Sequence, residues 1–432
     1  MALLRLIAEG VGPFKRLDLD FSDGKGNPRL GPHILAGVNG SGKSTVLRAI
    51  ARAAWWTGCG FDREAWQHLI SGQEGRVLAI VSDQVTGSPY PMSYGGDRSG
   101  NLVSWVDGEI RELQRLMPRL ALRYSPTEGD PNFNIAAYAP SLALSYVDAQ
   151  DMTTSLDDPW RGSLAFHDTV QNTAIQAWLL RVYSKRAIAR ERSESAEHYT
   201  RSLSRFESAL NLLYGEDVRL EVEIEPDFQP RLRMRNRALN FSQLPDSVRN
   251  TVGWVADFMM RQDLFKWTPE LGERRPGVLL LDEVDAHLHP RWQRLLLPAM
   301  RKALPDVQIV ATSHSPFVIS SCADAVIHVL EVNSEGVATN RPPAPAPVGE
   351  SITTTLKDVF GVESRFDVQT EHELNEWNDL TRRVAAGKIS PADRNRLSEL
   401  TAILSERSEE LRSIVGTTVR SSEAVLDALL HR

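Results

Sequence analysis

The chain has 432 residues, of which 42% are hydrophobic, and its formal net charge is −7. This length allows a large core and two or three subdomains, and the negative charge argues against a broad affinity for nucleic acid. The sequence has no apolar run of membrane-spanning length and no secretory pattern at its start, and its two cysteines, Cys59 and Cys322, lack metal-ligand spacing. We therefore expect a cytoplasmic protein that has no membrane partner.

Residues 34–44 predict a strand and a phosphate loop. Residues 34–36 form an apolar run fit for a buried strand. The next segment, Gly-Val-Asn-Gly-Ser-Gly-Lys-Ser at 37–44, fits the phosphate-loop pattern G-x-x-x-x-G-K-[ST]. Apolar residues at helical spacing follow it, so the segment has the strand–loop–helix context that the pattern requires.

This loop predicts a nucleotide site. Its glycines let the backbone turn so that N–H groups point at phosphate oxygens, and the positive end of the following helix faces them too. We expect Lys43 to reach the β- and γ-phosphates of ATP and the Ser44 hydroxyl to hold Mg²⁺. The predicted nucleotide-binding residues are Asn39, Gly40, Ser41, Gly42, Lys43, Ser44 and Thr45. The alternative is a glycine-rich turn before an ordinary helix.

Between the phosphate loop and residue 234, the sequence indicates a compact insertion of mixed structure. Residues 77–81, 102–106 and 120–124 are strand-like, and residues 165–214 have a helical pattern. The basic residues that cluster in the helical part are Arg181, Lys185, Arg186, Arg190 and Arg192. This cluster is either a solvated helix face or a contact for a DNA backbone or a partner protein.

Two stretches of alternating charge predict a β-hairpin after residue 214. Glutamates at 221, 223 and 225 alternate with apolar residues, and arginines at 231, 233, 235 and 237 do the same. Pro226 and Pro230 are expected to bracket the turn. Antiparallel pairing would set the glutamates opposite the arginines on one face, so cross-strand charge pairing is the first interpretation. A nucleic-acid or nucleotide contact is the alternative.

An acidic pair follows a second apolar run, at residues 278–281. A strand this apolar belongs in the middle of a sheet, and its carboxyl end should lie beside the phosphate loop. Asp282 can then hold Mg²⁺, and Glu283 can act as the base that polarises the attacking water. The alternative is a strand end with two solvated acids. Asp285 stands where a second subunit could contact it.

Three histidines follow the acidic pair. His287 and His289 could belong to a metal cluster, but Leu-His-Pro is more typical of a helix start with Pro290 in the first turn. Residues 307–311 predict a strand beside the acidic strand. His314 at its end could touch the γ-phosphate and sense hydrolysis, and a purely structural histidine is the alternative.

The C-terminal part begins with a proline-rich run at 341–347, which we expect to be a loop or linker. Residues 371–386 and 392–415 have helical patterns, with Gly387 and Pro391 between them. This tail is too short for an added nuclease domain. It is either a helical hairpin that only covers the core or a docking module.

Three segments together resemble a known family: the phosphate loop, Leu-Leu-Leu-Asp-Glu-Val-Asp-Ala-His-Leu-His-Pro, and Thr-Ser-His-Ser-Pro. They are similar to the ATP-binding-cassette (ABC) ATPases of the SMC and RecF type. Within that group they look most like the bacterial ATPases that accompany anti-phage effectors, such as the Septu ATPase subunit and the ATPase part of OLD nucleases. Residues 4–8 and 17–21 also look like the first strand pair of the family. The resemblance covers residues 1–60 and 235–330 and extends to the tail at 352–365.

The resemblance implies an α/β fold, an ABC-type P-loop NTPase head with a mixed α/β insertion and a small helical C-terminal tail. The implied divisions are an N-terminal lobe at 1–60, the insertion at 61–234, a C-terminal lobe at 235–340, and a linker and tail at 341–432. The family also has a glutamine loop, for which Gln84 and Gln150 are candidates without a clear position.

One segment departs from the family, which has a Leu-Ser-Gly-Gly-Gln-like signature at the start of a helix. A helix is predicted here over residues 248–259, but Pro245 occupies the position of the signature serine and has no hydroxyl to donate. Asp246 or Ser247 is suited to cap this helix. Ser247 could offer its hydroxyl to ATP bound by a second subunit, whereas Asp246 would repel that phosphate unless it caps the helix.

By resemblance, the chain is an ATP-hydrolysing switch that forms a homodimer or higher homo-oligomer through its heads. The implied partner is an effector protein encoded nearby, such as a nuclease, in anti-phage defence, and DNA is a further candidate. The alternatives are a RecF-like DNA-repair ATPase and a weakly hydrolysing, ATP-dependent scaffold.

Overall fold

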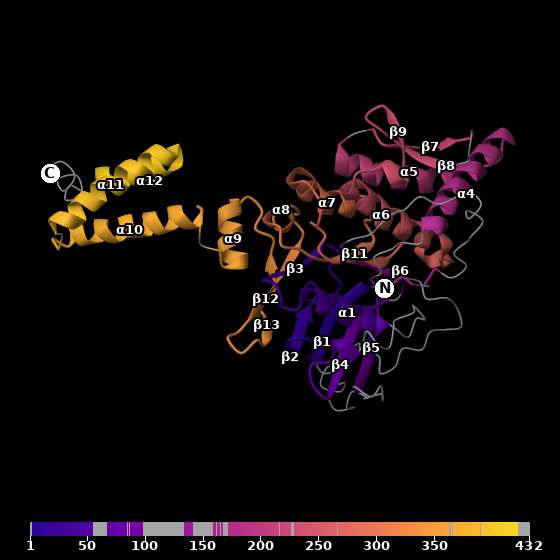
Figure 1. Cartoon of the computed structure of the whole chain (residues 1–432). Coiled ribbons are helices and arrows are strands. Elements are labelled where there is room, and N and C mark those ends of the chain that lie inside the picture. The colour runs from indigo at the N-terminus through magenta and orange to yellow at the C-terminus, as the bar shows by residue number, and fades with distance from the viewer. Residues whose placement is uncertain are drawn as a thin grey trace. The chain divides into compact units, whose positions relative to one another are not determined.

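The computed structural model divides the chain into two units, Met1–Thr355 and Leu356–Arg432 (Figure 1). The structure describes residues 2–54, 67–83, 85, 87–97, 134–140, 159–160, 162–164, 166, 172–215, 217–225, 229–265, 267–362, 364, 366–388 and 390–421. Gln84, Gln150 and the strands expected at 102–106 and 120–124 lie outside these residues. Within them, no helix combines the length and the hydrophobicity needed to cross a membrane.

In the described residues, a sheet of seven strands lies at the centre of the larger unit. Its parallel strands are, in order, β12 (Val326–Val332), β3 (His33–Gly37), β11 (Val307–Thr312), β10 (Gly277–Leu281) and β6 (Asn134–Tyr138). The short strands β13 (Ala338–Asn340) and β14 (Ala344–Pro345) pair antiparallel with β12 at one edge. β3, β6, β10 and β11 are buried along their whole length, as continuous apolar runs predict. The three strands predicted for this sheet are confirmed, and so is the position of β11 beside β10.

A second sheet carries the N-terminal strands. Its order is β2 (Phe14–Asp20), β1 (Ala2–Val11), β4 (Glu74–Ser82) and β5 (Pro89–Asp97), and all neighbours are antiparallel. The predicted first strand pair and the strand at 77–81 are thus confirmed. Helix α1 (Lys43–Ala53) contacts strands of both sheets through its buried apolar residues. The predicted insertion therefore supplies strands to both sheets of the head, β4 and β5 here and β6 in the central sheet.

The larger unit also contains long helices (Figure 1). They are α4 (Asn172–Glu191), α5 (Glu197–Tyr214), α6 (Asp246–Leu264) and α7 (Pro290–Ala303). Helix α5 packs against each of the other three, because Leu203, Phe206 and Leu210 recur at helical spacing and are fully buried. The helical prediction for 165–214 is confirmed where the structure describes that range. Arg181 and Lys185 are exposed on α4, which suits either interpretation of the basic cluster. Shorter helical segments are η3 (Phe241–Gln243), η4 (Pro269–Leu271), α8 (Pro316–Ile319) and α9 (Ile352–Phe360).

A small three-stranded sheet contains the predicted charged hairpin. Its strands are β7 (Arg219–Glu223), β8 (Gln229–Met234) and β9 (Arg237–Asn240). Arg233 forms an ion pair with Glu221, and Arg231 forms one with Glu223. The predicted cross-strand charge pairing is therefore confirmed for these four residues.

Two details of the hairpin prediction are wrong. Pro230 lies within β8, opposite Val222, instead of bracketing the turn, because the fixed φ of proline is compatible with extended backbone. The arginine stretch is also not one strand. Arg235 and Asn236 have φ values of 49° and 60°, so the chain turns there and Arg237 begins β9.

The proline-rich run at 341–347 was expected to be a loop or linker, but it contains a short strand. Ala344 and Pro345 form β14 and pair with Ile327 and Val326 of β12. This correction has a physical reason: β14 lies at the edge of the sheet, where a proline without an N–H breaks no ladder on its outer side.

The smaller unit is a bundle of α10 (Val368–Ala385), α11 (Pro391–Arg407) and α12 (Glu409–Ser421). Its own core consists of Trp377, Leu380, Val384, Leu397, Leu400, Leu404, Leu411 and Val415. The break between α10 and α11 is confirmed, but a single helix across 392–415 is wrong. The chain breaks at Ser408, which has extended backbone and whose Oγ accepts a hydrogen bond from the N–H of Leu411 at 3.1 Å.

Candidate active site

The phosphate loop connects β3 to α1. Gly37, Gly40 and Gly42 have φ values of 149°, 80° and 91°, a region that glycine adopts at no steric cost. Gly42 is also the N-cap of α1, and a Cβ at this position would lie 2.5 Å from the ring of Phe14. Helix α1 therefore begins at Lys43, and the unpaired N–H groups of its first turn adjoin the loop, as in the anion sites at helix N-termini.

Lys43 is buried within this loop. Its side chain is 7% exposed, and Nζ donates hydrogen bonds to the carbonyl oxygens of Gly37 and Val38 at 3.0 and 2.9 Å. Burial lowers the pKa of Lys43, and the negative charge of nearby carboxylates, above all that of Asp282, opposes this shift. The ammonium group thus lies between the loop carbonyls and the acidic strand end, where added phosphate charge could be neutralised.

Asp282 connects the acidic strand to the phosphate loop. Ser44 Oγ donates to Asp282 Oδ1 at 2.9 Å, and Thr312 Oγ1 donates to the same oxygen at 2.7 Å. The backbone N–H of Asp282 donates to the carbonyl oxygen of Tyr138 at 3.0 Å, which continues the pairing of β10 with β6. The side-chain donors around Asp282 are all oxygens, and oxygen ligands are those that Mg²⁺ prefers. Ser44 and Asp282 therefore fit a Mg²⁺ site in chemistry and in distance.

Glu283 follows the end of β10 and has an unusual backbone conformation. Its φ is 45°, in the left-handed region that residues other than glycine rarely adopt, and such residues cluster at functional sites. Its N–H donates to Thr312 Oγ1 at 2.6 Å, which fixes this turn. The side chain is exposed, so the carboxylate can contact water.

His314 follows β11 and lies next to the loop after the acidic pair. Its N–H donates to Asp285 Oδ1 at 3.3 Å, and the side chain is half-buried. Burial and then the charge of Lys43 lower the pKa of His314, while the surrounding carboxylates oppose the shift. Gln293 of α7 joins the two loops, because Nε2 donates to the carbonyl oxygen of Asp285 at 3.1 Å and Oε1 accepts from Ser315 Oγ at 2.7 Å.

The other predicted phosphate-loop residues have different environments. Asn39 and Gly40 are exposed, whereas Ser41 is fully buried and its Oγ has no hydrogen-bond partner among the described residues. The side chain of Ser41 thus faces the protein, and only its backbone could meet a nucleotide. Thr45 packs against Gly12, where a Cβ would lie 2.5 Å from Thr45 Cγ2.

His289 begins α7, as the sequence predicts. Its Nδ1 accepts a hydrogen bond from the N–H of Arg291 at 3.2 Å, and Pro290 occupies the first turn. His287 has a φ of 62° and is exposed in the preceding turn. In the described part of the chain, no group of three or more His, Cys, Asp or Glu residues could hold a metal ion by itself.

The start of α6 differs from the prediction. The N-cap is Pro245, and no side chain caps the first turn, so the expectation that Asp246 or Ser247 is the N-cap is wrong. Because Pro245 is the N-cap, Asp246 and Ser247 are the first and second residues of the helix. Asp246 is exposed and its carboxylate forms an ion pair with Arg249 in the next turn, while Ser247 is half-buried.

Two parts of this region were not predicted from the sequence. One is Thr312, which binds both Asp282 and the backbone of Glu283. The other is a buried triad, in which Tyr138 Oη and Arg261 Nε both donate to Asp257 Oδ2 at 2.6 Å. Burial raises the pKa of Tyr138 well above its usual value. The spacing of Asp257 and Arg261, four residues apart in an apolar helix, was a signal that the sequence offered.

The triad links α6 to the acidic strand end. The Asp257 and Arg261 side chains are 1% and 4% exposed, and Arg261 also donates to the carbonyl oxygen of Pro159 at 2.7 Å. Tyr138 is the last residue of β6, and its carbonyl oxygen binds the N–H of Asp282. Tyr138 thus contacts α6 through its hydroxyl and Asp282 through its carbonyl oxygen.

Comparison with family models identifies the same region. The model described as "AAA domain, putative AbiEii toxin, Type IV TA system" matches residues 262–320, which include β10, the acidic pair, α7 and His314. In the central sheet, β11 lies between the phosphate-loop strand β3 and the acidic strand β10. This mixed α/β arrangement places the phosphate loop after β3 and the acidic pair after β10, on either side of β11.

The chain also resembles ATPases of retron and Septu systems. It is 20% identical over 354 residues to "Retron Vc95 probable ATPase" of Vibrio cholerae serotype O1 biovar El Tor, covering 69% of this chain and 68% of that protein. It is 28% identical over 189 residues to "Septu protein PtuA" of Bacillus mycoides (strain KBAB4), covering 44% of this chain and 25% of that protein. It is 32% identical over 83 residues to "Retron Ec83 probable ATPase" of Escherichia coli, covering 19% of this chain and 15% of that protein. The matches to the second and third relatives thus span a quarter or less of those proteins.

Solved structures of SMC heads are similar over most of the chain. The SMC head bound to the C-terminal winged-helix domain of ScpA is 14% identical, with a TM-score of 0.48, and covers 80% of this chain and 98% of that chain. The SMC head domain from Thermotoga maritima is 16% identical, with a TM-score of 0.42, and covers 79% of this chain and 99% of that chain.

Proposed function

We propose that the chain binds ATP with Mg²⁺ between the phosphate loop and the acidic pair, and hydrolyses it. The observation that carries this proposal is the 2.9 Å contact between Ser44 and Asp282, which brings the start of α1 against the end of β10. Lys43 lies at the same place, and its two bonds to loop carbonyl oxygens are ones that phosphate oxygens can replace. Ser44 and Asp282 would hold Mg²⁺, which neutralises charge on the β- and γ-phosphates when it is bound.

Glu283 would act as the general base. It accepts a proton from water while the water oxygen forms a bond to the γ-phosphorus and the bond from that phosphorus to the bridging oxygen of ADP breaks. Thr312 is a positioning residue, because it holds Asp282 through its hydroxyl proton and Glu283 through its oxygen lone pair. His314 would contact the γ-phosphate, since it lies half-buried beside Lys43 and Asp285.

The test separates binding from hydrolysis. Lys43→Ala should abolish binding of a fluorescent ATP analogue, because it removes the phosphate charge partner. Glu283→Gln should keep that binding and lower the rate of phosphate release by about 10²–10⁴-fold, the usual contribution of a general base. Glu335→Gln changes an exposed glutamate in the turn after β12 and is the matched control. Hydrolysis at the wild-type rate in Glu283→Gln would show that its proposed role is wrong.

We also propose that two heads pair around ATP. Ser247 in the first turn of α6 and Asp285 after the acidic pair are the residues that would face the nucleotide of the partner. Asp285 already accepts the N–H of His314, so its position depends on the loop that carries this histidine. Light scattering of Glu283→Gln should give the mass of a dimer with ATP and that of a monomer without it. A monomer under saturating ATP contradicts the shared site.

The partner of this switch is proposed to be an effector protein, in anti-phage defence in the cytoplasm. The resemblance to ATPases of retron and Septu systems supports this assignment. Two surfaces can recruit a partner: the three-helix unit α10–α12, which has its own core, and the exposed basic residues of α4, which are the candidate for DNA.

Deletion and charge reversal distinguish these surfaces. Removing residues 367–432 should abolish capture of the neighbouring gene product but leave ATP hydrolysis intact, because the proposed catalytic residues precede this unit. Changing Arg181, Lys185 and Arg186 to glutamate should instead abolish a salt-sensitive interaction with DNA. Full retention of both interactions would favour the alternative of a weakly hydrolysing, ATP-dependent scaffold, which Pro245 at the position of the signature serine also favours.

A further inference from the structure

A charged cleft lies at the end of β10 and β11 opposite to the acidic pair. It has a volume of about 350 Å³ and is lined by the first turns of α5, the end of α6, the segment before β10 and the end of α7. The lining includes Val307, the first residue of β11, which pairs in register with Gly277, the first residue of β10. Because the phosphate loop adjoins the carboxyl ends of these strands, the cleft is a separate site.

Four cations and three carboxylates line the cleft; they are Arg201, Arg205, Arg275 and Lys302, and Asp263, Glu273 and Asp306. Of its four cations, only Arg201 forms an ion pair within the described residues, with Glu197 and Glu273. Lys302 is exposed at the end of α7. Among the described residues, the half-buried Arg205 donates one hydrogen bond, from Nη2 to Gln262 Oε1 at 2.7 Å. A guanidinium has five N–H donors, so these residues leave most of the donor capacity of Arg205 unused.

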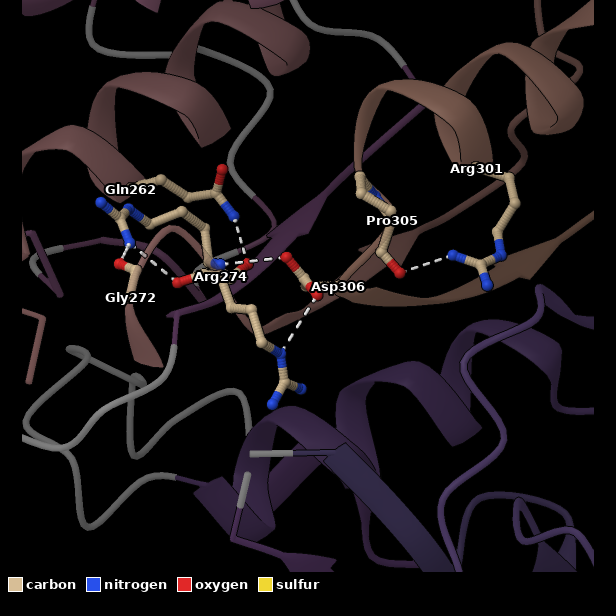
Figure 2. Close-up of polar contacts among 7 residues, drawn as sticks. Gln262, Gly272, Arg274, Arg301, Pro305 and Asp306 are labelled. Carbon is tan, nitrogen blue, oxygen red and sulfur yellow. Dashed lines mark hydrogen bonds and ion pairs between the residues drawn. The ribbon is translucent and has the colours of Figure 1, made fainter. Parts of the chain in front are cut away.

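The carboxylates of the cleft are mostly occupied. Glu273 binds Arg201, and Asp306 accepts hydrogen bonds from Arg274 Nε at 3.4 Å and from the N–H of Arg275 at 3.2 Å (Figure 2). The third, Asp263, forms no ion pair among the described residues; burial raises its pKa, and a hydrogen bond from Ser202 and the charge of Arg205 oppose this shift. Burial likewise lowers the pKa of Arg205, and the nearby carboxylates of Asp263 and Asp306 offset this shift only in part.

The cleft is also held in place by buried polar contacts. Gln262 is fully buried, and its Nε2 donates to the carbonyl oxygen of Arg275 at 3.0 Å (Figure 2). Its Oε1 accepts the hydrogen bond from Arg205. The Arg275 guanidinium donates to the carbonyl oxygen of Gly272 at 2.9 Å and lies over the ring of Trp267 at 5.5 Å. A ligand would therefore meet side chains that are already ordered, which lowers the entropic cost of binding.

We propose that this cleft binds a phosphate group, carried either by a small nucleotide or by a nucleic-acid strand, with Arg205 and Lys302 as its main cations. The guanidinium fork of Arg205 matches two phosphate oxygens, and Lys302 adds a point charge at the rim. The volume lies within the range of about 300–1,000 Å³ that is usual for small-ligand pockets. This proposal does not depend on ATP hydrolysis at the phosphate loop.

The experiment uses the full chain with Lys43→Ala, so that the phosphate loop no longer contributes to binding. The probes are inorganic phosphate, AMP and a single-stranded oligonucleotide with a 5′-phosphate, each titrated by calorimetry. At least one probe should bind, and Arg205→Gln should weaken it by about tenfold or more, the typical effect of a lost charge-assisted hydrogen bond. Arg237→Gln, an exposed arginine in β9, is the matched control and should change nothing.

Lys302→Gln is the second variant. Lys302 is exposed, so we expect its substitution to leave folding intact, and the proposal can be tested with this variant even if Arg205→Gln is unstable. Binding of phosphate or AMP that both cleft variants weaken supports the small-nucleotide source. Binding of the oligonucleotide alone, again weakened by both variants, supports the nucleic-acid source. No binding of any probe, or binding that neither variant weakens, overturns the proposal.

Discussion

Two glycines of the phosphate loop offer a matched test of how the loop is held. Gly40 and Gly42 have similar left-handed φ values, 80° and 91°. A Cβ at Gly42 would lie 2.5–2.6 Å from ring carbons of Phe14 and 2.8 Å from Cγ of Pro13, whereas a Cβ at Gly40 would meet nothing within 4 Å. Gly42→Ala should therefore destabilise the protein much more than Gly40→Ala.

The expected magnitudes follow from these surroundings. Left-handed backbone costs an alanine about 1–2 kcal/mol at either position. Phe14 is 1% exposed and belongs to the core beneath α1, so its ring cannot move aside freely. Overpacking a core by one methyl group costs a further ~1–3 kcal/mol, and only Gly42→Ala incurs it.

The measurement is thermal unfolding in the absence of nucleotide, which separates folding from ligand binding. In a large unit, each kcal/mol corresponds to roughly 2 °C in Tm, so Gly42→Ala should melt ~2–6 °C below Gly40→Ala. Equal losses in Tm would refute the conclusion that packing of Phe14 against the N-cap sets the start of α1.

Three further predictions concern buried polar groups and the tail. Arg261→Met removes the only cation bonded to Asp257 in the described residues. The free energy of unfolding of the larger unit should fall by ~3–5 kcal/mol and its Tm should fall with it, whereas an unchanged Tm would contradict the role of the triad. His33 and His328 are fully buried, and burial lowers their pKa to about 4 and about 3, so the unfolded chain binds protons below about pH 6.5 that the folded chain does not. Stability should therefore fall as the pH falls from about 6.5. The decrease in Tm between about pH 7.5 and pH 5 should be smaller in His33→Gln than in the wild type, and an equal decrease would contradict this prediction. Trp377→Ala should cost ~3–5 kcal/mol and unfold only the smaller unit, so that limited proteolysis removes the tail while ATP hydrolysis persists; a protease-resistant tail would contradict this.

The phosphate loop and the acidic strand could be predicted because their signals are local. Residues 37–44 carry a complete motif, and the apolar run before Asp282 identifies a buried parallel strand by composition alone. Thr312 could not be assigned a role in the same way. Its contact with Asp282 depends on the register of β11 against β10, in which Leu281 lies opposite Ala311, and no local pattern encodes a register between strands 30 residues apart.

The errors at helix ends have a common cause. The apolar pattern on both sides of Ser408 is helical, so the break there depends on one hydroxyl that caps α12 instead of continuing α11. At the start of α6, Pro245 takes the N-cap position that the sequence analysis gave to Asp246 or Ser247. Hydrophobic periodicity predicts where a helix lies, but single side-chain contacts decide where it begins and ends. Each such contact contributes only about 1 kcal/mol.

The order of strands in the central sheet has a consequence for synthesis on the ribosome. β3 is paired on one side with β11 and on the other with β12, and both partners are made long after it. At about 5–20 residues per second, the ribosome needs ~14–55 s to extend the chain from Gly37 to Thr312, the end of β11. Until then the strand before the phosphate loop is an apolar segment with two unpaired edges. The nascent chain should therefore require a chaperone that shields it, and fragments that end before β11 should aggregate instead of forming a small nucleotide-binding domain.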